Sequence, residues 1–139
     1  MPTYPRSELP KECITCKQTK PALDFATVTR NQDGIDCYCR PCHGNVRRYN
    51  RYRLSQDNYN AMLEAQENAC AICKAQFVDG ISACVDHDHN CCPNGGSCGA
   101  CVRGLLCHLC NKGIGGFEDD VDRLRQAIFY LERTEVASV

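Results

Sequence analysis

The stretch of the chain with the most reactive side chains is the run Asp86-His87-Asp88-His89. On an extended backbone alternate side chains share a face, so the two carboxylates would lie opposite the two imidazoles. A turn directly after a strand would break this alternation and bring all four side chains near one point. Carboxylates and imidazoles placed in this way can hold a divalent cation and move a proton. The alternatives are a solvated polar loop and additional zinc ligands.

Cysteines occur in C-x2-C pairs, which are typical of zinc knuckles. Two pairs together supply four thiolates, a tetrahedral ligand set that suits Zn2+ and leaves no position open for a substrate. We therefore predict two structural zinc sites. The first comprises Cys13, Cys16, Cys39 and Cys42, and the second comprises Cys70, Cys73, Cys107 and Cys110. A disulfide pair or an iron–sulfur site is the alternative for the first set, in which Cys37 or His43 could also replace a ligand.

A third group of cysteines lies in a glycine-rich stretch that we predict to be a loop over residues 91–99. Its members are Cys91, Cys92, Cys98 and Cys101. They either bind a third zinc ion, which we favour, or remain as thiols. Cys37 and Cys84 are left over and are expected to behave as small buried side chains.

The composition explains why metal would be needed. The chain has 139 residues, 14 of them cysteines that inflate its 43% hydrophobic fraction, and it has no tryptophan. The remaining apolar side chains are few for one sizeable core, so bound metal or disulfides must contribute to stability. Residues 1–10 lack the apolar segment of a secretory signal, and no apolar run is long enough to span a bilayer. We therefore expect the protein to lie in a reducing cytoplasm and to have no membrane partner. A disulfide-rich secreted domain is the alternative.

The formal net charge of −1 hides a strongly basic segment. Residues 38–55 contain five arginines and no acidic residue, and residues 45–54 suit a helix. Tyr49 and Tyr52 alternate with the arginines and could stack or pack. Such a segment can contact nucleic acid, and the best candidates for contact with a nucleic-acid backbone are Arg47, Arg48, Arg51 and Arg53. Alternatively, these arginines pair with acidic residues near the end of the chain.

Four further elements are expected from the pattern of apolar residues. A helix is predicted over residues 56–68, with Ser55 as its N-cap. Short strands are predicted over residues 83–86 and 102–106. Apolar residues at three- and four-residue steps predict an amphipathic helix over residues 119–132, whose acidic first turn complements the helix dipole.

The ordered motifs resemble one known family. In chain order, the motifs are Cys70-Ala-Ile-Cys73, the Asp86–His89 run and Arg103-Gly-Leu-Leu-Cys107-His-Leu-Cys110-Asn111. Together they are similar to the motifs of the recombination endonuclease VII family of bacteriophages, whose members are ββα-metal (His-Me finger, H-N-H) nucleases. The resemblance covers about residues 66–131, and the upstream knuckles resemble an N-terminal zinc module of some phage relatives. It implies a small zinc-stabilised α+β fold, with a ββα-metal nuclease core, an N-terminal four-cysteine zinc finger and flanking helices.

The resemblance also suggests a division of the chain into four parts. Residues 1–44 would form the zinc-finger module and residues 45–68 a basic and amphipathic helical linker. Residues 69–116 would form the zinc-bound nuclease core, and residues 117–139 a C-terminal amphipathic helix and tail.

The activity that the resemblance implies is metal-dependent hydrolysis of DNA phosphodiester bonds. His87 would act as the general base, while Asp86 and Asn111 would hold one divalent cation, Mg2+ or Mn2+. Asp88 and His89 would contact phosphate or support these groups. Arg103 would contact phosphate near the metal or brace Asp88.

The implied substrate is branched, Holliday-junction-like or nicked phage DNA in the host cytoplasm, and a homodimer is left open. Many relatives have a short linker where this chain inserts residues 91–101, so the inserted knuckle would shape substrate access or brace the loop. The alternative function is a non-catalytic zinc-finger DNA-binding regulatory protein. Asn111 argues against it, because a zinc finger does not need that residue at that spacing.

Overall fold

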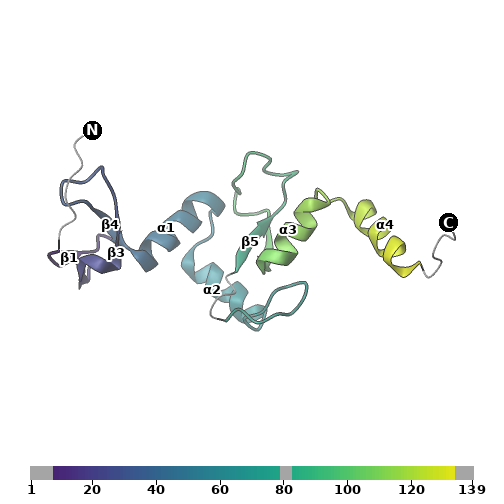
Figure 1. The fold of residues 1–139 in the computed structure, drawn as a ribbon, viewed down its shortest axis with the longest axis horizontal. Coiled ribbons are helices and arrows are strands. Elements are labelled where there is room, and N and C mark those ends of the chain that lie inside the picture. The colour runs from purple at the N-terminus through teal and green to yellow at the C-terminus, as the bar shows by residue number, and fades with distance from the viewer. Residues whose placement is uncertain (1–7, 79–82, 134–139) are drawn as a thin grey trace, which may run out of the picture. The chain divides into compact units, whose positions relative to one another are not determined.

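The computed structural model describes residues 8–78 and 83–133 (Figure 1). The chain divides after Gln56 into two compact units, and each is described here by itself. No helix within the described ranges is long and apolar enough to cross a membrane.

The first unit consists of two small antiparallel hairpins and a helix. Its elements are β1 (Lys11–Glu12), β2 (Thr19–Lys20), the 3-10 helix η1 (Ala22–Asp24), β3 (Phe25–Thr27), β4 (Ile35–Cys39) and α1 (Arg40–Tyr52). β1 pairs with β2, and β3 pairs with β4. The core contains Ala22, Phe25 and Ile35 together with Cys13 and Cys39. The core is small and partly made of thiols, as the composition predicted.

Helix α1 begins at Arg40, earlier than the expected start at residue 45. The extended backbone of Cys39 forms the N-cap, and Pro41 occupies the first turn, where its missing N–H costs no hydrogen bond. Arg53 ends the helix in the left-handed conformation, with φ of 53°, and donates its N–H to the carbonyl of Tyr49. The expected boundary after residue 44 therefore lies inside α1.

The second unit contains one antiparallel hairpin followed by a helix. Its elements are α2 (Gln56–Ala65, whose first residue ends the first unit), β5 (Cys84–His87), β6 (Val102–Leu106), α3 (His108–Gly116) and α4 (Val121–Glu132). α3 contacts both strands of the hairpin. β5, β6 and α3 thus form the expected ββα arrangement.

The register of the hairpin shifts at the end of β5. Asp86 lies opposite Gly104, whereas His87 lies opposite Val102, so Arg103 is the additional residue on β6. Such a bulge redirects side chains locally and is frequent beside active sites. The predicted strand over residues 102–106 is confirmed, whereas β5 begins and ends one residue later than predicted.

Two helix boundaries also differ from expectation. α2 ends at Ala65 rather than residue 68, because Glu67 and Asn68 adopt positive φ angles of 54° and 56°. α4 begins at Val121 rather than residue 119, because the Asp120 carboxylate caps the helix by accepting from the N–H groups of Asp122 and Arg123. Helical periodicity did not indicate α3, since its sequence contains three glycines.

A glutamine side chain joins the segment after α2 to the hairpin. Nε2 of Gln66 donates to the carbonyl oxygens of Ala69 and Leu105, both at 2.8 Å. Its Oε1 accepts from the backbone N of Leu105 at 2.9 Å, so the amide pairs with this residue as a neighbouring strand would. A Cβ at Gly104 would lie 3.3 Å from the same Oε1, and glycine allows this close approach.

Candidate active site and metal centres

The structure brings the cysteines together in three groups of four. Within each group the Sγ atoms all lie within 4.8 Å of one another, and all 14 cysteines are free thiols. One sulfur pair in each group is separated by 4.0 Å, 3.7 Å and 3.9 Å, respectively. Tetrahedral zinc with Zn–S bonds of about 2.3 Å requires S–S distances of about 3.8 Å. All three groups therefore suit zinc, and their members are those predicted.

The first group excludes the two alternative ligands considered above. Sγ of Cys37 donates to Oδ1 of Asp36 at 3.5 Å, and Nδ1 of His43 lies 3.5 Å from Oδ2 of the same carboxylate. Both side chains face this buried aspartate, and neither belongs to the group of four thiols.

The thiols of this group differ widely in acidity. Burial by itself raises the pKa of Cys13, but the N–H groups of Cys16, Cys39 and Thr15 outweigh it and lower the pKa to about 6. Burial and the neighbouring thiols raise the pKa of Cys42 to about 12. One thiolate thus forms readily, and a bound cation would stabilise the others.

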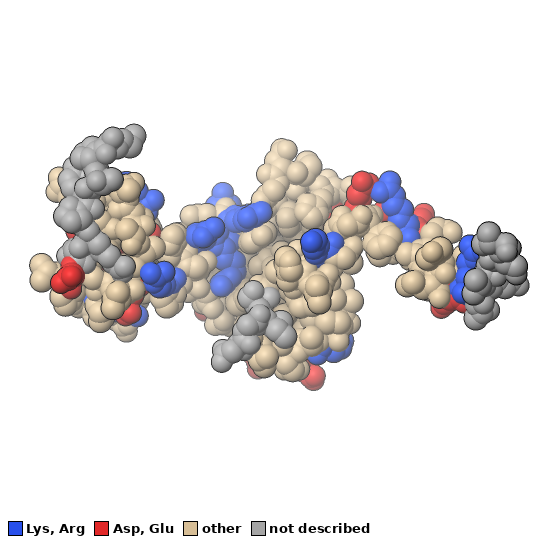
Figure 2. Space-filling view, in the orientation of Figure 1, with Lys and Arg blue, Asp and Glu red and all other residues tan. Residues whose placement is uncertain are grey.

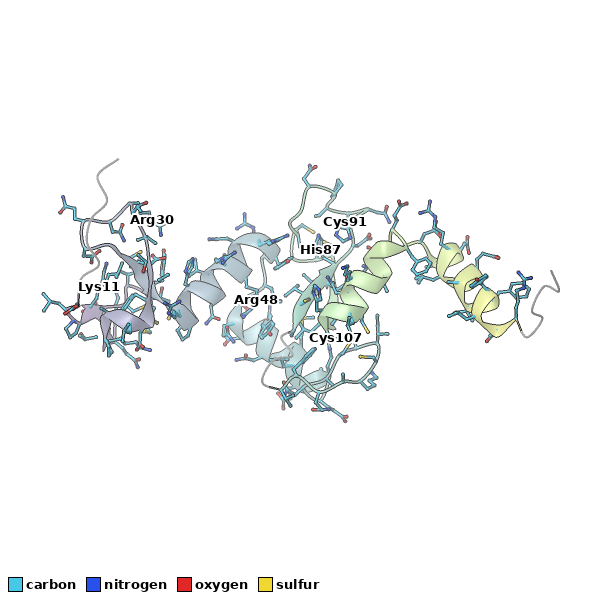
Figure 3. The ribbon with its side chains drawn as sticks, viewed as in Figure 1. Lys11, Arg30, Arg48, His87, Cys91 and Cys107 are labelled. Atoms are coloured by element: carbon cyan, nitrogen blue, oxygen red, sulfur yellow. The ribbon has the colours of Figure 1, made fainter. Side chains whose placement is uncertain are left out.

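The third group lies in the predicted loop, which connects β5 to β6. The backbone N of Asp88 donates to the carbonyl of Cys101 at 3.0 Å, and that of Cys92 donates to the carbonyl of Asp88 at 3.1 Å. Ser97 lies inside the loop, with its Oγ 3.1 Å from Sγ of Cys101. The loop leaves from the end of the strand that carries His87, as Figure 3 shows for the labelled His87 and Cys91.

Asp86 is buried on β5 and is bound by an arginine. Nε of Arg103 donates to Oδ2 of Asp86 at 2.7 Å, and Nη2 donates to Oδ1 at 3.0 Å. The expectation that Arg103 braces Asp88 is therefore wrong. Oδ1 of Asp88 instead accepts from the backbone N of Asn90 at 2.9 Å and stabilises the turn after the strand. The contact between Arg103 and DNA stays a prediction.

His87 ends β5 and is only 5% exposed. Its ring centroid lies 4.5 Å from that of His89, so the turn brings the two imidazoles together. Nδ1 of His89 lies 2.9 Å from Oδ2 of Asp119, which links this histidine to the segment between α3 and α4.

Asp119 is not indicated by the sequence, because the predicted helix over residues 119–132 places it among the acidic residues of its first turn. The backbone takes left-handed φ angles at Glu118 and Asp119, 58° and 55°, before α4 begins. The Asp119 side chain is only 6% exposed, and its Oδ2 accepts from Nη2 of Arg103 at 3.0 Å. Burial alone would raise the pKa of Asp119, but the hydrogen bonds from His89 and Arg103 outweigh it and lower the pKa.

Asn111 lies in the first turn of α3, directly after Cys110 of the second cysteine group. Its backbone N donates to the carbonyl of Cys107 at 3.0 Å. Through α3 it belongs to the helix that contacts β5. Oδ1 of Asp119 is buried and has no hydrogen-bond partner among the described residues. The carboxylate of Asp86 and the side-chain amide of Asn111 offer oxygen donors of the kind that Mg2+ or Mn2+ prefers, and the assignment of these two residues to one cation stays a prediction.

The predicted basic helix is α1, and basic side chains gather over it (Figure 2). A shallow groove is lined by Gly44, Arg47, Arg48, Asn50, Arg51 and Tyr52. Nη1 of Arg48 donates to Oε1 of Gln56 at 2.8 Å, and the Arg51 guanidinium lies 5.4 Å from the centroid of the Tyr52 ring.

The acidic residues around the start of α4 have arginine partners nearby in the sequence. Glu118 pairs with Arg123, and Asp122 pairs with Arg125. The alternative in which acidic residues near the end of the chain pair with the arginines of α1 stays a prediction. Val121, Ile128, Phe129 and Leu131 of α4 are exposed, and the homodimer stays a prediction.

Comparison with known proteins finds a matching family model and similar phage proteins. The model of the family described as recombination endonuclease VII matches residues 45–133. The Gene 59 protein of Mycobacterium phage D29 is 35% identical over 89 residues, which is 63% of this chain and 49% of that protein. The Gene 59 protein of Mycobacterium phage L5 is 35% identical over 81 residues, 58% of this chain and 44% of that protein. The chain thus spans about half the length of these curated relatives.

Among solved structures, this chain is similar to the crystal structure of the β-β-α-Me type II restriction endonuclease Hpy99I, with 28% sequence identity. The match covers 91% of this chain and 66% of that chain, with a TM-score of 0.37.

Proposed function

Because the chain belongs to the recombination endonuclease VII family, we propose that it is a metal-dependent DNA endonuclease that hydrolyses phosphodiester bonds. The observation that carries the proposal is the position of Asp86 and His87. Both are buried at the end of β5, beside a helix that carries Asn111 and contacts that strand. In this proposal a cation ligand and a proton acceptor are neighbouring residues at the end of one strand.

In this proposal His87 removes the proton from a water molecule as its oxygen attacks phosphorus. The bond between phosphorus and the 3′ oxygen breaks, and its electron pair stays on that oxygen, which takes up a proton from solvent. The products are a 5′ phosphate and a 3′ hydroxyl. A divalent cation, Mg2+ or Mn2+, held by Asp86 and Asn111, would neutralise the charge that develops on the phosphate. Asp119 orients His89, whose ring contacts His87.

We further propose that all three cysteine groups bind zinc. Cys107 is the N-cap of α3 and Cys110 lies in its first turn, while Cys70 and Cys73 come from the segment before the hairpin. Zinc in this group would fix the helix that carries Asn111 against β5 and β6. Zinc in the inserted loop would replace the apolar core that a glycine-rich segment lacks, and would hold Asp88 and His89 in their turn.

The substrate that this proposal favours is branched or nicked phage DNA in the host cytoplasm. The groove on α1 supplies arginines for the phosphate backbone and an aromatic ring under one guanidinium. Contacts of this type position a protein on DNA without reading its sequence, which suits an enzyme that recognises DNA structure.

The decisive experiment incubates zinc-loaded protein with supercoiled plasmid and Mg2+ or Mn2+. We expect the wild type to cut, and His87→Ala to cut at least about a hundredfold more slowly, the usual contribution of a general base. His108→Ala is the matched control, because His108 is exposed between two zinc-group cysteines. A folded His87→Ala protein that cuts at the wild-type rate would show the mechanism to be wrong.

A second assay compares linear duplex, nicked duplex and four-way junctions as substrates. Preferential cutting of the last two is expected. A wild type that binds these DNAs tightly, loses this binding without zinc, and cuts none of them would instead support the zinc-finger regulatory protein.

A further inference from the structure

The guanidinium of Arg103 lies between two buried carboxylates of the proposed active site. It contacts both oxygens of Asp86, at 2.7 Å and 3.0 Å, and Oδ2 of Asp119 at 3.0 Å. The two carboxylate side chains are only 8% and 6% exposed, whereas that of Arg103 is 39% exposed. The N–H edge of one guanidinium therefore contacts two buried carboxylates, while the rest of the arginine side chain is partly exposed.

This arrangement conflicts with direct entry of a cation. Both oxygens of Asp86 already accept charge-assisted hydrogen bonds in a fork geometry, which is the strongest form of this interaction. A divalent ion that coordinates Asp86 must take at least one of these oxygens. Arg103 would then keep its bond to Asp119, which comes from a different segment of the chain and holds the guanidinium near its present position.

We infer that Arg103 is a resident cation that gives up one of its two carboxylate partners when the divalent ion binds. Asp86 is then free to coordinate the ion, while Asp119 keeps Arg103 at the edge of the site. The inference rests on the proposed function and deepens it. Before the ion arrives, Arg103 keeps Asp86 from being an uncompensated buried charge. After the ion has bound, a DNA phosphate can accept hydrogen bonds from the N–H groups of Arg103 that Asp86 has released. Arg103 is thus a competitor of the ion, and Asp119 is a positioning residue that acts through Arg103.

The bulge in the hairpin explains why Arg103 can do this. Without the register shift between Asp86 and His87, the residues from Val102 to Gly104 would alternate strictly across the sheet. The additional residue on β6 is Arg103 itself. Left-handed backbone at Glu118 and Asp119 directs the second carboxylate to the same point, and such conformations concentrate at functional sites.

The test measures binding of Mn2+ to the zinc-loaded full chain, from the electron paramagnetic resonance signal of the free ion. Arg103→Gln should bind Mn2+ about tenfold more tightly or better, because the ion no longer displaces charge-assisted hydrogen bonds. Arg103→Lys keeps the positive charge but cannot make the two-pronged contact with Asp86, so its Mn2+ affinity should lie between those of the wild type and Arg103→Gln. Arg125→Gln, which removes an exposed arginine paired with Asp122, is the control and should leave Mn2+ affinity unchanged.

Asp119→Asn separates positioning from direct coordination. It should weaken Mn2+ binding severalfold in the wild-type background, since Arg103 would then be held by Asp86 alone. In the Arg103→Gln background the same change should have no effect. If it still weakens binding there, Asp119 acts on the ion directly and its assignment as a partner of Arg103 is wrong.

A spectroscopic measurement completes the test. Addition of Mg2+ to the wild type should shift the NMR resonance of the Arg103 Nε–H, and an unmoved resonance at saturating Mg2+ would overturn the inference. Mn2+ binding that requires Asp86 but is not tightened in either Arg103 variant would also overturn it, and would leave the proposed function intact. If neither the wild type nor these variants bind Mn2+, the proposed function fails together with the inference.

Discussion

Replacement of Gln66 by methionine should destabilise the second unit strongly, although the residue has no part in the proposed chemistry. Its side-chain amide exchanges two hydrogen bonds with the buried backbone of Leu105 and donates a third to the carbonyl of Ala69. Methionine has a similar length and volume but cannot make these bonds, so the change isolates the hydrogen bonds from the packing.

The magnitude follows from which groups lose a partner. The carbonyl of Leu105 also accepts from the N of Ala71 at 3.1 Å and keeps that bond. The N–H of Leu105 loses the acceptor in Gln66, at a cost of about 1–3 kcal/mol for an unsatisfied buried donor. The bond to Ala69 adds about 1 kcal/mol. We therefore expect the free energy of unfolding to fall by about 2–4 kcal/mol.

Urea denaturation at a fixed free zinc concentration would measure this change. Because the chain has no tryptophan, far-UV circular dichroism is the appropriate signal. Gln126→Met on the exposed face of α4 is the matched control and should change the free energy of unfolding by less than about 0.5 kcal/mol. A Gln66→Met protein within this same margin of the wild type would refute the argument that the amide supports β6.

Three further predictions concern metal, DNA and pH. Cys91→Ser should reduce bound zinc by one ion per chain in elemental analysis, whereas Cys37→Ser should retain all of it; equal zinc in both variants would contradict the third site. Replacing Arg47 and Arg51 by glutamine should reduce the slope of log affinity for duplex DNA against log salt by about 0.9 for each phosphate that the variant no longer neutralises, and an unchanged slope would remove α1 from the interface. The pKa of Asp119 should lie below its ordinary value of 3.8, so its contribution to stability is complete above that value and is lost as pH falls through the lower, folded-state pKa. A carbon-detected NMR titration of this carboxyl with a midpoint at or above 3.8 would contradict the ion pairs with His89 and Arg103.

The sequence alone determined features that depend on short stretches of chain. The first two cysteine groups could be predicted because each C-x2-C pair places two thiols on one tight turn, whatever surrounds it. The third group contains one such pair, Cys98 and Cys101, and could be predicted because its four cysteines lie close together in a glycine-rich stretch. The strand over residues 102–106 could be predicted from its local apolar pattern, and α4 from its period. Local signals were weaker at element ends, where the left-handed backbone at Asn68 and the cap at Asp120 moved the boundaries.

Only the tertiary structure decided which side chains meet. The partner of Arg103 is Asp86 rather than Asp88 because a register shift, which involves both strands, turns the arginine toward the buried carboxylate. Asp119 joins the site because the left-handed backbone at Glu118 and Asp119 places its carboxylate against His89 and Arg103, and nothing in its neighbours along the sequence distinguishes it from the acids that only begin a helix. Spacing along the chain thus identifies groups that act through local geometry, whereas contacts between distant segments depend on how strands pair and helices pack.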